Sequence, residues 1–476
     1  MASPSIAVIG AGFSGTLLTL HLLRRCRPEA RISLIERNSR FGHGQAYSTG
    51  NPSHLLNVPA GRMSAFHDRP TDFLEWLRGQ HEPAAHPEDF VPRGTYGAYV
   101  RSLLKKELRR APRGRLELIR GAVLGIDRST DRLRLALERG RIVEADLAVL
   151  AVGNFPPEPM PVSDPTFYDT DFYRADPWSP YALAGLDPDA PVMFIGSGLT
   201  MVDVAISLLD QGHTGPLLAL SRRGLLPRAH EPGPVMAGTL VQAFPTSLAQ
   251  LLHCLRQEAR RAEPARGSWQ PIIDELRPFM SDVWQAMSFD DKQRFLRHAR
   301  PWWDVHRHRM PPAVAERIVQ AQEKGQLEVR AGRVSGFEIT GDRVVVTYRL
   351  RRSEAFQSVE VARVINCSGP SADFARIADP LIRSLLAQGA ARADPLRLGL
   401  DVTSNCALLQ RDGGVSRRIF AVGPVTKGAF WEITAVPDLR RQCELLAEHL
   451  AGLLRRTDEG THSRESASGP AASYAI

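Results

Sequence analysis

The sequence predicts an α/β protein with two three-layer nucleotide-binding units, the first of which is split by the second. Three features lead to this prediction. A buried strand, a glycine-rich turn and a helix follow one another near the amino terminus, and the same series returns at residue 192. Later in the chain, short apolar runs end in glycine, as parallel strands do where they reach a bound nucleotide.

The composition is that of an ordinary globular protein, with 476 residues, 43% of them hydrophobic and 24% charged. These values exclude a collagen, a wholly disordered chain and a membrane bundle. No apolar run approaches the ~18–20 residues of a spanning helix, so we expect no membrane partner. The apolar run 6–9 has no basic segment before it and leads into a glycine turn, so a secretory signal is not expected.

The net charge and the cysteines narrow the possible protein classes further. The net charge of +8 would suit an acidic partner, but the basic residues comprise five lysines and 55 arginines. This skew is typical of a GC-rich genome, and we expect no nucleic-acid partner. The five cysteines lie far apart without a Cys-x-x-Cys pair, which argues against a metal site and a dithiol close in sequence. A reducing, cytoplasmic location fits best.

The first unit begins with the strand 6–9 and continues through the pattern Gly-x-Gly-x-x-Gly into an apolar helix. Gly10 permits the tight turn, Gly12 lets the backbone approach a pyrophosphate, and Gly15 lets the helix pack against the strand. The phosphates would meet free N–H groups at the positive end of the helix dipole. The next strand ends at Glu36, whose carboxylate can accept hydrogen bonds from a ribose. The sequence therefore predicts a dinucleotide site.

The second unit has the strand 192–195, a similar turn and the helix 201–210. Its next strand ends in a serine and two arginines where the first unit has an acid. Arginine pairs bidentately with phosphate oxygens, so this unit favours NADPH over NADH, although a solvated basic turn would look the same. The residues expected at this site are Gly196, Ser197, Gly198, Leu199, Thr200, Ser221, Arg222 and Arg223.

Two such sites in one chain allow one nucleotide to reduce the other. The chain resembles the two-dinucleotide-binding-domain flavoproteins through its segments 40–47, 145–153, 364–369 and 419–423. The resemblance implies two Rossmann-like domains, with FAD in the first unit and NADPH in the second. It also implies that FAD contacts Gly10, Gly12, Ser14, Gly15, Glu36, Arg37, Gln45, Asn57, Met63, Val123, Gly153 and Gly423.

A narrower resemblance is carried by the segments 44–47, 54–59, 221–227 and 431–437. They are similar to a bacterial family of FAD/NAD(P)-binding oxidoreductases, some of which are flavin N-monooxygenases of amino acids. One departure concerns Pro424, which stands where dithiol reductases of the superfamily have an aspartate on the flavin ribityl chain. We do not assign that role to Asp438.

The domain organisation follows from the order of these motifs. The FAD domain is expected to be split, with the NADPH domain and a helical insertion between its two parts. A small meander is expected from the strands 116–120 and 133–138. The expected bounds are 1–165 and 361–456 for the FAD domain, 166–360 for the NADPH domain, about 238–326 for the helical insertion that could roof the cleft, and 457–476 for a disordered tail.

The function expected first is that of a monooxygenase. NADPH would reduce FAD, and the reduced flavin would form a C4a-hydroperoxide with molecular oxygen and hydroxylate a small amine or carboxylate substrate. The alternatives are an NAD(P)H-dependent reductase or dehydrogenase without oxygen insertion, and a flavin-binding sensor or interaction protein. The catalytic candidates are Asn57, His230 and Arg309.

Two aromatic segments carry alternatives. The stretch 300–309 combines cations and tryptophans, and it could receive a substrate carboxylate, bind single-stranded nucleic acid or form an amphipathic helix. Arg228 and His230 could face the nicotinamide or lie at the surface. Trp431 could flank the flavin or belong to the core.

Overall fold

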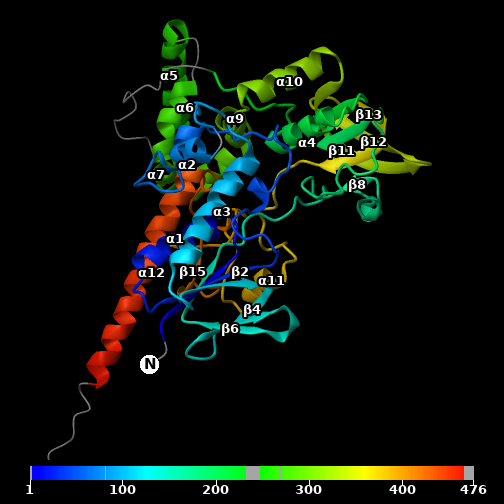
Figure 1. Ribbon diagram of the computed structural model, residues 1–476. Helices are drawn as coiled ribbons and strands as arrows, with labels where there is room; N and C mark the ends of the chain where they lie inside the picture. The colour runs from blue at the N-terminus through cyan, green and yellow to red at the C-terminus, as the bar shows by residue number, and fades with distance from the viewer. Residues whose placement is uncertain (1–2, 81, 232–246, 267–269, 466–476) are drawn as a thin grey trace, which may run out of the picture.

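The computed structural model describes residues 3–80, 82–231, 247–266 and 270–465. Two mixed sheets form its framework, and a group of helices lies at the upper left of the view in Figure 1. None of the helices in the described ranges is both long and apolar enough to cross a membrane.

The first sheet has the strand order β15-β16-β7-β1-β2-β3. Its central strands β1 and β7 are fully buried, as expected of parallel strands covered on both faces. The chain runs outward through β1, β2 and β3 and then returns to the other side of β1 with β7, which makes a topological switch point between β1 and β7. The bounds are β1 Ser5–Ile9, β2 Arg31–Glu36, β3 Leu116–Arg120, β7 Leu147–Leu150, β15 Ala407–Leu409 and β16 Val415–Ala421.

Helices cover one face of this sheet, and a meander with one helix covers the other. Helices α1, α3 and α12 run beside one another in Figure 1, and they share one hydrophobic core with β1 and β2. The second core lies under the meander β4-β5-β6 and α11. The bounds are α1 Phe13–Arg25, α2 Asp72–Gln80, α3 Arg93–Arg110, α11 Pro380–Ala387, α12 Val436–Glu465, β4 Val123–Asp127, β5 Leu133–Leu137 and β6 Ile142–Ala145.

The second sheet has the order β13-β12-β11-β10-β9-β14-β8. It is parallel from β8 to β11, and β11 then continues past a bulge into an antiparallel ladder with β12 and β13. Helices α4 and α10 pack on one face. The bounds are β8 Tyr173–Arg174, β9 Val192–Ile195, β10 Leu217–Ser221, β11 Leu327–Thr340, β12 Arg343–Leu350, β13 Phe356–Val361, β14 Arg363–Asn366, α4 Leu199–Asp210 and α10 Pro312–Glu323.

Three details of the expected organisation need correction. The FAD domain was expected to resume at residue 361, but β14 pairs with β9 and β8, so the second sheet extends to Asn366. The strand Leu116–Arg120 was expected in the meander, but it pairs with β2 as the edge of the main sheet. The tail was expected to be disordered from residue 457, but α12 continues to Glu465, and residues 466–476 lie outside the described part.

The helical insertion lies between β10 and β11. Its core contains Trp284 and Trp303 and also takes in Trp431 of the FAD domain, so the insertion packs directly on that domain. Residues 232–246 and 267–269 of the segment lie outside the described part. The bounds are α5 Leu248–Arg266, α6 Gln270–Leu276, α7 Met280–Ala286, α8 Phe289–Arg294 and α9 Arg300–Arg307.

Single turns complete the structure. Short 3-10 turns lie at Gln45–Tyr47, Ala60–Arg62, Glu138–Gly140, Pro165–Asp169, Arg277–Phe279 and Pro424–Thr426, and a π-helical turn lies at Phe295–Ala299.

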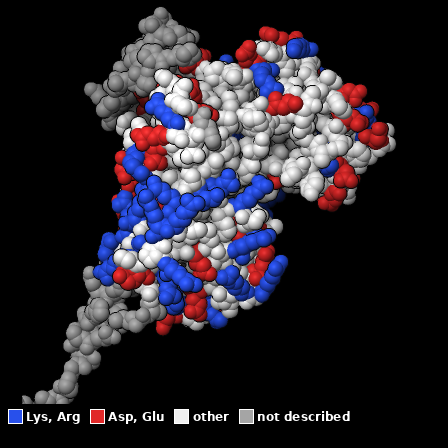
Figure 2. Space-filling view, in the orientation of Figure 1, with Lys and Arg blue, Asp and Glu red and all other residues white. Residues whose placement is uncertain are grey.

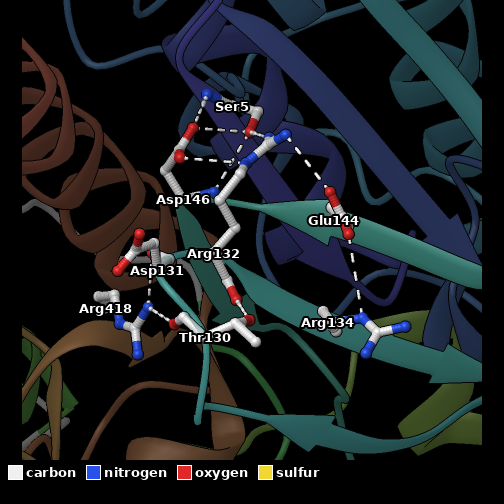
Figure 3. A network of polar contacts seen from close by, with 8 residues as sticks. All are labelled: Ser5, Thr130, Asp131, Arg132, Arg134, Glu144, Asp146 and Arg418. Atoms are coloured by element: carbon white, nitrogen blue, oxygen red, sulfur yellow. Dashed lines mark hydrogen bonds and ion pairs between the residues drawn. The ribbon is translucent and has the colours of Figure 1, made fainter. Parts of the chain in front are cut away.

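A polar network ties the meander to the amino ends of the strands of the first sheet (Figure 3). Ser5 donates through its N–H and its hydroxyl to Asp146, and Arg132 pairs with Asp146 at 3.3 Å. Arg418 donates to the backbone carbonyl of Thr130 at 2.9 Å. This network lies at the opposite end of the strands from the glycine turns, so it stabilises the domain away from the expected site.

The positive charge is unevenly spread over the surface. In Figure 2, lysines and arginines gather over the region where Figure 1 shows α3. The cations on the exposed side of α3 have no ion pair with any described residue. They are Arg101, Lys105, Lys106, Arg109 and Arg110.

Candidate cofactor-binding sites

The first glycine turn lies at the switch point between β1 and β7. Gly10 has a φ of +106°, and a Cβ there would lie 2.3 Å from the carbonyl oxygen of Ala151. A Cβ on Gly15 would lie 1.8 Å from the carbonyl oxygen of Gly10. Both glycines are therefore required by the fold itself, whether or not a cofactor is bound.

Gly12 differs from these two glycines. A Cβ on Gly12 would meet only the Cα of Gly44, at an ordinary contact distance of 3.5 Å. Gly12 precedes the first turn of α1, so the unpaired N–H groups of that turn lie beside it. Packing of the chain does not require glycine here, whereas a pyrophosphate brought against this backbone would.

Glu36 is held beside the same turn at the end of β2. Its Oε2 accepts the N–H of Ala11 at 2.8 Å, and its Oε1 accepts the N–H of Asn38 at 3.0 Å. Each carboxylate oxygen can accept a further hydrogen bond, so the side chain is oriented and still able to receive ribose hydroxyls.

The ends of β7 and β16 complete this edge of the sheet. Gly153 follows β7 with a φ of +72°, and a Cβ there would point into open space. Gly423 follows β16 with a φ of +85°, and a Cβ there would lie 2.7 Å from the hydroxyl of Ser14. Gly423 thus lies beside Ser14 in the first turn of α1, and Gly153 lies at the end of the neighbouring strand β7.

The remaining residues expected to contact FAD differ in exposure and in their partners. Arg37 pairs with Asp379 at 2.9 Å and is half exposed. Gln45 is exposed. Met63 and Val123 are buried in the two cores of the domain. Contact of these four residues with FAD remains a prediction.

Asn57 and His230 come together from the two domains. His230 Nε2 donates to the backbone carbonyl of Asn57 at 3.0 Å, and its ring packs on Phe90. Burial lowers the pKa of His230, which favours the neutral ring. The side-chain amide of Asn57 makes no hydrogen bond with any described residue. His230 therefore positions the loop, and the Asn57 amide stays available.

Arg309 is fully engaged in the helical insertion. Its guanidinium makes two hydrogen bonds to Asp274, at 3.0 and 3.1 Å, and others to the carbonyls of Gln270 and His306. The residue is 3% exposed. This geometry favours a structural role over the catalytic one considered from the sequence.

The structure also shows where the aromatic segments lie. Residues 300–307 of the stretch 300–309 form α9, with Trp303 buried and Trp302 46% exposed. Trp431 is 2% exposed in the core of the insertion. Asp438, near the start of α12, pairs with Arg277 at 3.4 Å.

The second glycine turn repeats the geometry of the first. Gly196 has a φ of +108°, and a Cβ there would lie 2.4 Å from the carbonyl oxygen of Cys367. A Cβ on Gly198 would meet nothing within 4 Å. The Oγ atoms of Ser197 and Ser221 lie 2.8 Å apart and hold the turn to the end of β10. The strand β14 thus does for this site what β7 does for the first.

Arginines from several elements gather beside this turn. Arg222 has no ion pair with any described residue, and its pKa is lowered by partial burial and by the charges of Arg300, Arg333 and Arg223. Arg300 of this group pairs with Asp304, but the positive charge of the group exceeds the negative charge of its partners, which suits a phosphate dianion. The sequence indicated Arg222 and Arg223, but it missed Arg300 and Arg333 in this role because they belong to α9 and β11.

A buried polar cluster joins the two domains near these turns. Arg93 of α3 pairs with Asp203 of α4 at 2.7 Å. His54 Nε2 lies 2.9 Å from the Asp203 carbonyl and 2.8 Å from the Ser207 hydroxyl. Burial raises the pKa of Asp203 and lowers that of His54. We call His54, Arg93, Asp203 and Ser207 the domain latch.

Comparison with known proteins gives a match for the first unit. Residues 7–155 match the model of a family described as FAD-NAD(P)-binding. No curated protein matches the chain. Among the described residues, no group of three His, Cys, Asp or Glu side chains is placed to hold a metal ion.

Solved structures extend the likeness to nearly the whole chain. The reduced ornithine hydroxylase of Pseudomonas aeruginosa has a TM-score of 0.66 at 14% identity, over 95% of this chain and 100% of that one. The ornithine N-hydroxylase of Kutzneria sp. 744, solved with reduced FAD, NADP+ and L-ornithine, has a TM-score of 0.66 at 16% identity, over 96% and 100%. The thioredoxin reductase of Lactococcus lactis has 0.54 at 11% identity, over 95% and 99%. The predicted fold of two Rossmann-like domains is confirmed.

Proposed function

We propose that the protein is an FAD- and NADPH-dependent monooxygenase that hydroxylates a small amine. The observation that carries this proposal is the pair of equivalent glycine turns in one chain. Gly10 lies against Ala151 and Gly196 against Cys367, each at a switch point where a diphosphate can approach the backbone. Two sites joined by a buried interface allow electrons to pass from one nucleotide to the other.

The side chains have separate tasks in this reaction. The turn around Gly12 binds the FAD diphosphate, and Glu36 binds its ribose. Arg222 and its neighbouring arginines bind the 2′-phosphate of NADPH. His230 holds the backbone of Asn57, whose side-chain amide stays available for a polar contact with the cofactor or substrate. FAD, when bound, supplies the two-electron chemistry and the reaction with oxygen.

The overall reaction balances as a monooxygenation. NADPH and a proton give two electrons and, with one molecule of O2 and an amine R–NH2, yield NADP+, water and R–NHOH. One oxygen atom enters the new N–O bond, and the other leaves as water.

Two observations support oxygen insertion over a dithiol reductase. The hydroxylases that act on ornithine, lysine and cadaverine have TM-scores of 0.62 to 0.66, against 0.54 and 0.52 for thioredoxin reductases. All five cysteines are free, and burial raises the pKa of Cys367, Cys406 and Cys443. Buried thiols of high pKa are poor nucleophiles for disulfide exchange.

The domain latch supports the same conclusion. Rotation of one domain against the other would separate Arg93 from Asp203 and leave two buried charges without partners, which costs several kcal/mol. We therefore infer that NADPH oxidation and substrate oxidation occur in one domain arrangement.

The test measures where the oxygen goes. The FAD-loaded protein is supplied with NADPH in air and with primary amines, including ornithine, lysine and cadaverine. Oxygen uptake, hydrogen peroxide and the product mass are then followed together. We expect one amine to yield a product heavier by one oxygen atom, in proportion to the NADPH oxidised. Peroxide alone with every amine would favour the reductase without oxygen insertion.

A further inference from the structure

Lys427 is a cation without a counterion at the junction of the FAD domain and the helical insertion. It follows the turn Pro424–Thr426 at the end of β16 and is partly buried. Its ammonium nitrogen lies 4.6 Å from the ring centroid of Trp431. The ammonium makes no hydrogen bond or ion pair with any described residue, and the backbone N–H donates to Pro424. The Trp431 ring face gives this ammonium a cation–π contact, but its N–H groups have no hydrogen-bond acceptor in the described chain.

The indole of Trp431 offers a second unused donor in the same place. Its ring stacks on Trp284, with centroids 5.0 Å apart, and receives the edge of Phe295 at 5.2 Å. The residue is 2% exposed, yet its Nε1 has no hydrogen-bond partner in the described part of the chain. A buried N–H without an acceptor is uncommon in a folded protein and indicates a place for one.

The charges around this ring leave one positive charge in excess. Arg300 of α9 lies 5.5 Å from the Trp431 centroid and pairs with Asp304 at 3.3 Å. Glu432 is occupied by Arg307, at 3.2 Å, and by the indole of Trp303, at 2.7 Å. Each carboxylate therefore has its own arginine, and Lys427 is left over.

We infer that Lys427, Arg300 and the indole N–H of Trp431 form an anion site that receives a carboxylate of the substrate. The inference rests on the proposed function, because it names the group by which the amine substrate is held. A carboxylate has two acceptor oxygens and one negative charge, so it can satisfy both unused donors and balance the extra charge. The side chains of Arg300 and Asp304 are about two-fifths exposed, so solvent reaches the α9 side of the ring, while the indole N–H itself is enclosed.

A phosphate of NADPH is the other source of an anionic oxygen group. Arg300 lies 5.5 Å from the Trp431 centroid, and its charge also lowers the pKa of Arg222 at the NADPH site, so it acts on both places. The carboxylate is favoured because Lys427 belongs to the FAD-domain side of the junction, after β16. The experiment must still separate the two sources.

The test uses the FAD-loaded full-length protein and propionate as the probe. Propionamide, which has the same shape without the charge, is the matched ligand. Binding is measured by calorimetry at constant ionic strength for the wild type and for Lys427→Met, Lys427→Arg and Trp431→Phe. Lys324→Met is the control variant, because Lys324 is exposed after α10. FAD content and melting temperature confirm that each variant is folded.

We expect saturable binding of propionate and none of propionamide. Lys427→Met should weaken propionate binding at least tenfold, and Trp431→Phe should weaken it less. Lys427→Arg should restore most of the affinity, and Lys324→Met should leave it unchanged. Equal binding of propionate to the wild type and Lys427→Met, or no saturable binding to the wild type, would overturn the inference.

A second arm titrates the same variants with NADP+. We expect Lys427→Met to bind NADP+ as the wild type does. Competition between propionate and NADP+, together with weaker NADP+ binding in Lys427→Met, would assign the site to a nucleotide phosphate and overturn the carboxylate assignment. Failure of the proposed function is distinguishable, since it appears as peroxide release in turnover while propionate binding needs no turnover.

Discussion

Glycines of one turn serve different purposes, and single substitutions can separate them. A Cβ on Gly15 would collide with the Gly10 carbonyl at 1.8 Å, whereas a Cβ on Gly12 would make an ordinary contact with Gly44. The first requirement comes from the packing of α1 on β1, and the second, we propose, comes from a ligand. The same motif thus contains a fold position and a binding position.

We expect Gly12→Ala to fold normally and to lose FAD affinity by tenfold or more. Gly15→Ala should instead destabilise the apoprotein by ~1–3 kcal/mol, because the backbone must shift to admit the methyl group. Flavin-to-protein ratios and urea unfolding of the apoproteins measure the two effects. Full FAD retention by Gly12→Ala would mean that the diphosphate does not cross this residue.

Coenzyme choice is a second property of single residues. Arg222→Ala and Arg333→Ala should each reduce the preference for NADPH over NADH by tenfold or more, since a hydrogen bond to a charged group contributes ~1.5–3 kcal/mol. The measurement is the ratio of kcat/KM for the two coenzymes in flavin reduction. Arg349→Ala on β12, an exposed arginine paired with Glu354, should leave the ratio unchanged. An unchanged ratio in Arg222→Ala would show that the 2′-phosphate binds elsewhere.

The protonation of Lys427 gives a pH dependence with a definite sign. Burial and, after it, Arg300 lower the pKa of Lys427 to about 8, while Asp304 and Glu432 oppose the shift. The neighbouring His308 has a pKa lowered by burial, which favours its neutral form. Only the ammonium form attracts an anion, so propionate binding should weaken as the pH rises from about 7 to about 9. Calorimetry across this range checks it, and affinity that increases with pH would contradict it.

Elements far apart in the chain decide how the two domains meet. The latch unites α3 with α4 and the loop that carries His54. Its charges are almost fully enclosed, with exposed side-chain fractions of 14% for Arg93 and 8% for Asp203. Removal of one partner therefore matters more than the presence of the pair.

We expect Asp203→Ala to lower the free energy of unfolding by ~3–5 kcal/mol, because Arg93 is left buried without its partner. The double variant Arg93→Met with Asp203→Ala should recover part of this loss. Arg317→Ala breaks a more exposed pair with Asp210 and should cost less than ~1 kcal/mol. Urea unfolding followed by circular dichroism compares the three. A small effect of Asp203→Ala would mean that the domains are not fixed by this contact.

At the scale of the whole molecule, the helical insertion is the part that distinguishes the two nucleotide sites. It contributes Arg300 both to the arginines beside Arg222 and to the ring of Trp431. The two nucleotide turns are nearly equivalent in geometry and say little about the substrate. The proposed substrate group therefore depends on the junction between the insertion and the FAD domain.

Part of this organisation could be predicted from the sequence, and part could not. The glycine turns are contiguous motifs, and so are Glu36 in the first unit and the arginines that follow Ser221 at the equivalent place in the second. The structure places them at strand ends as expected. The ion pair of Arg309 and the sheet to which β14 belongs could not be predicted. The pairing of Arg309 with Asp274 and of β14 with β9 depends on which surfaces meet after folding.

The sequence by itself determined the two glycine turns and their order along the chain. A tight turn before a helix depends only on residues that are neighbours in the sequence. Only the tertiary structure decided that Arg300 approaches Arg222 and Trp431, that Lys427 lacks a counterion, and that Arg93 meets Asp203. These contacts join residues from separate elements, and they form only when the hydrophobic faces of those elements pack together. The apolar pattern of one element does not show which other element it will pack against.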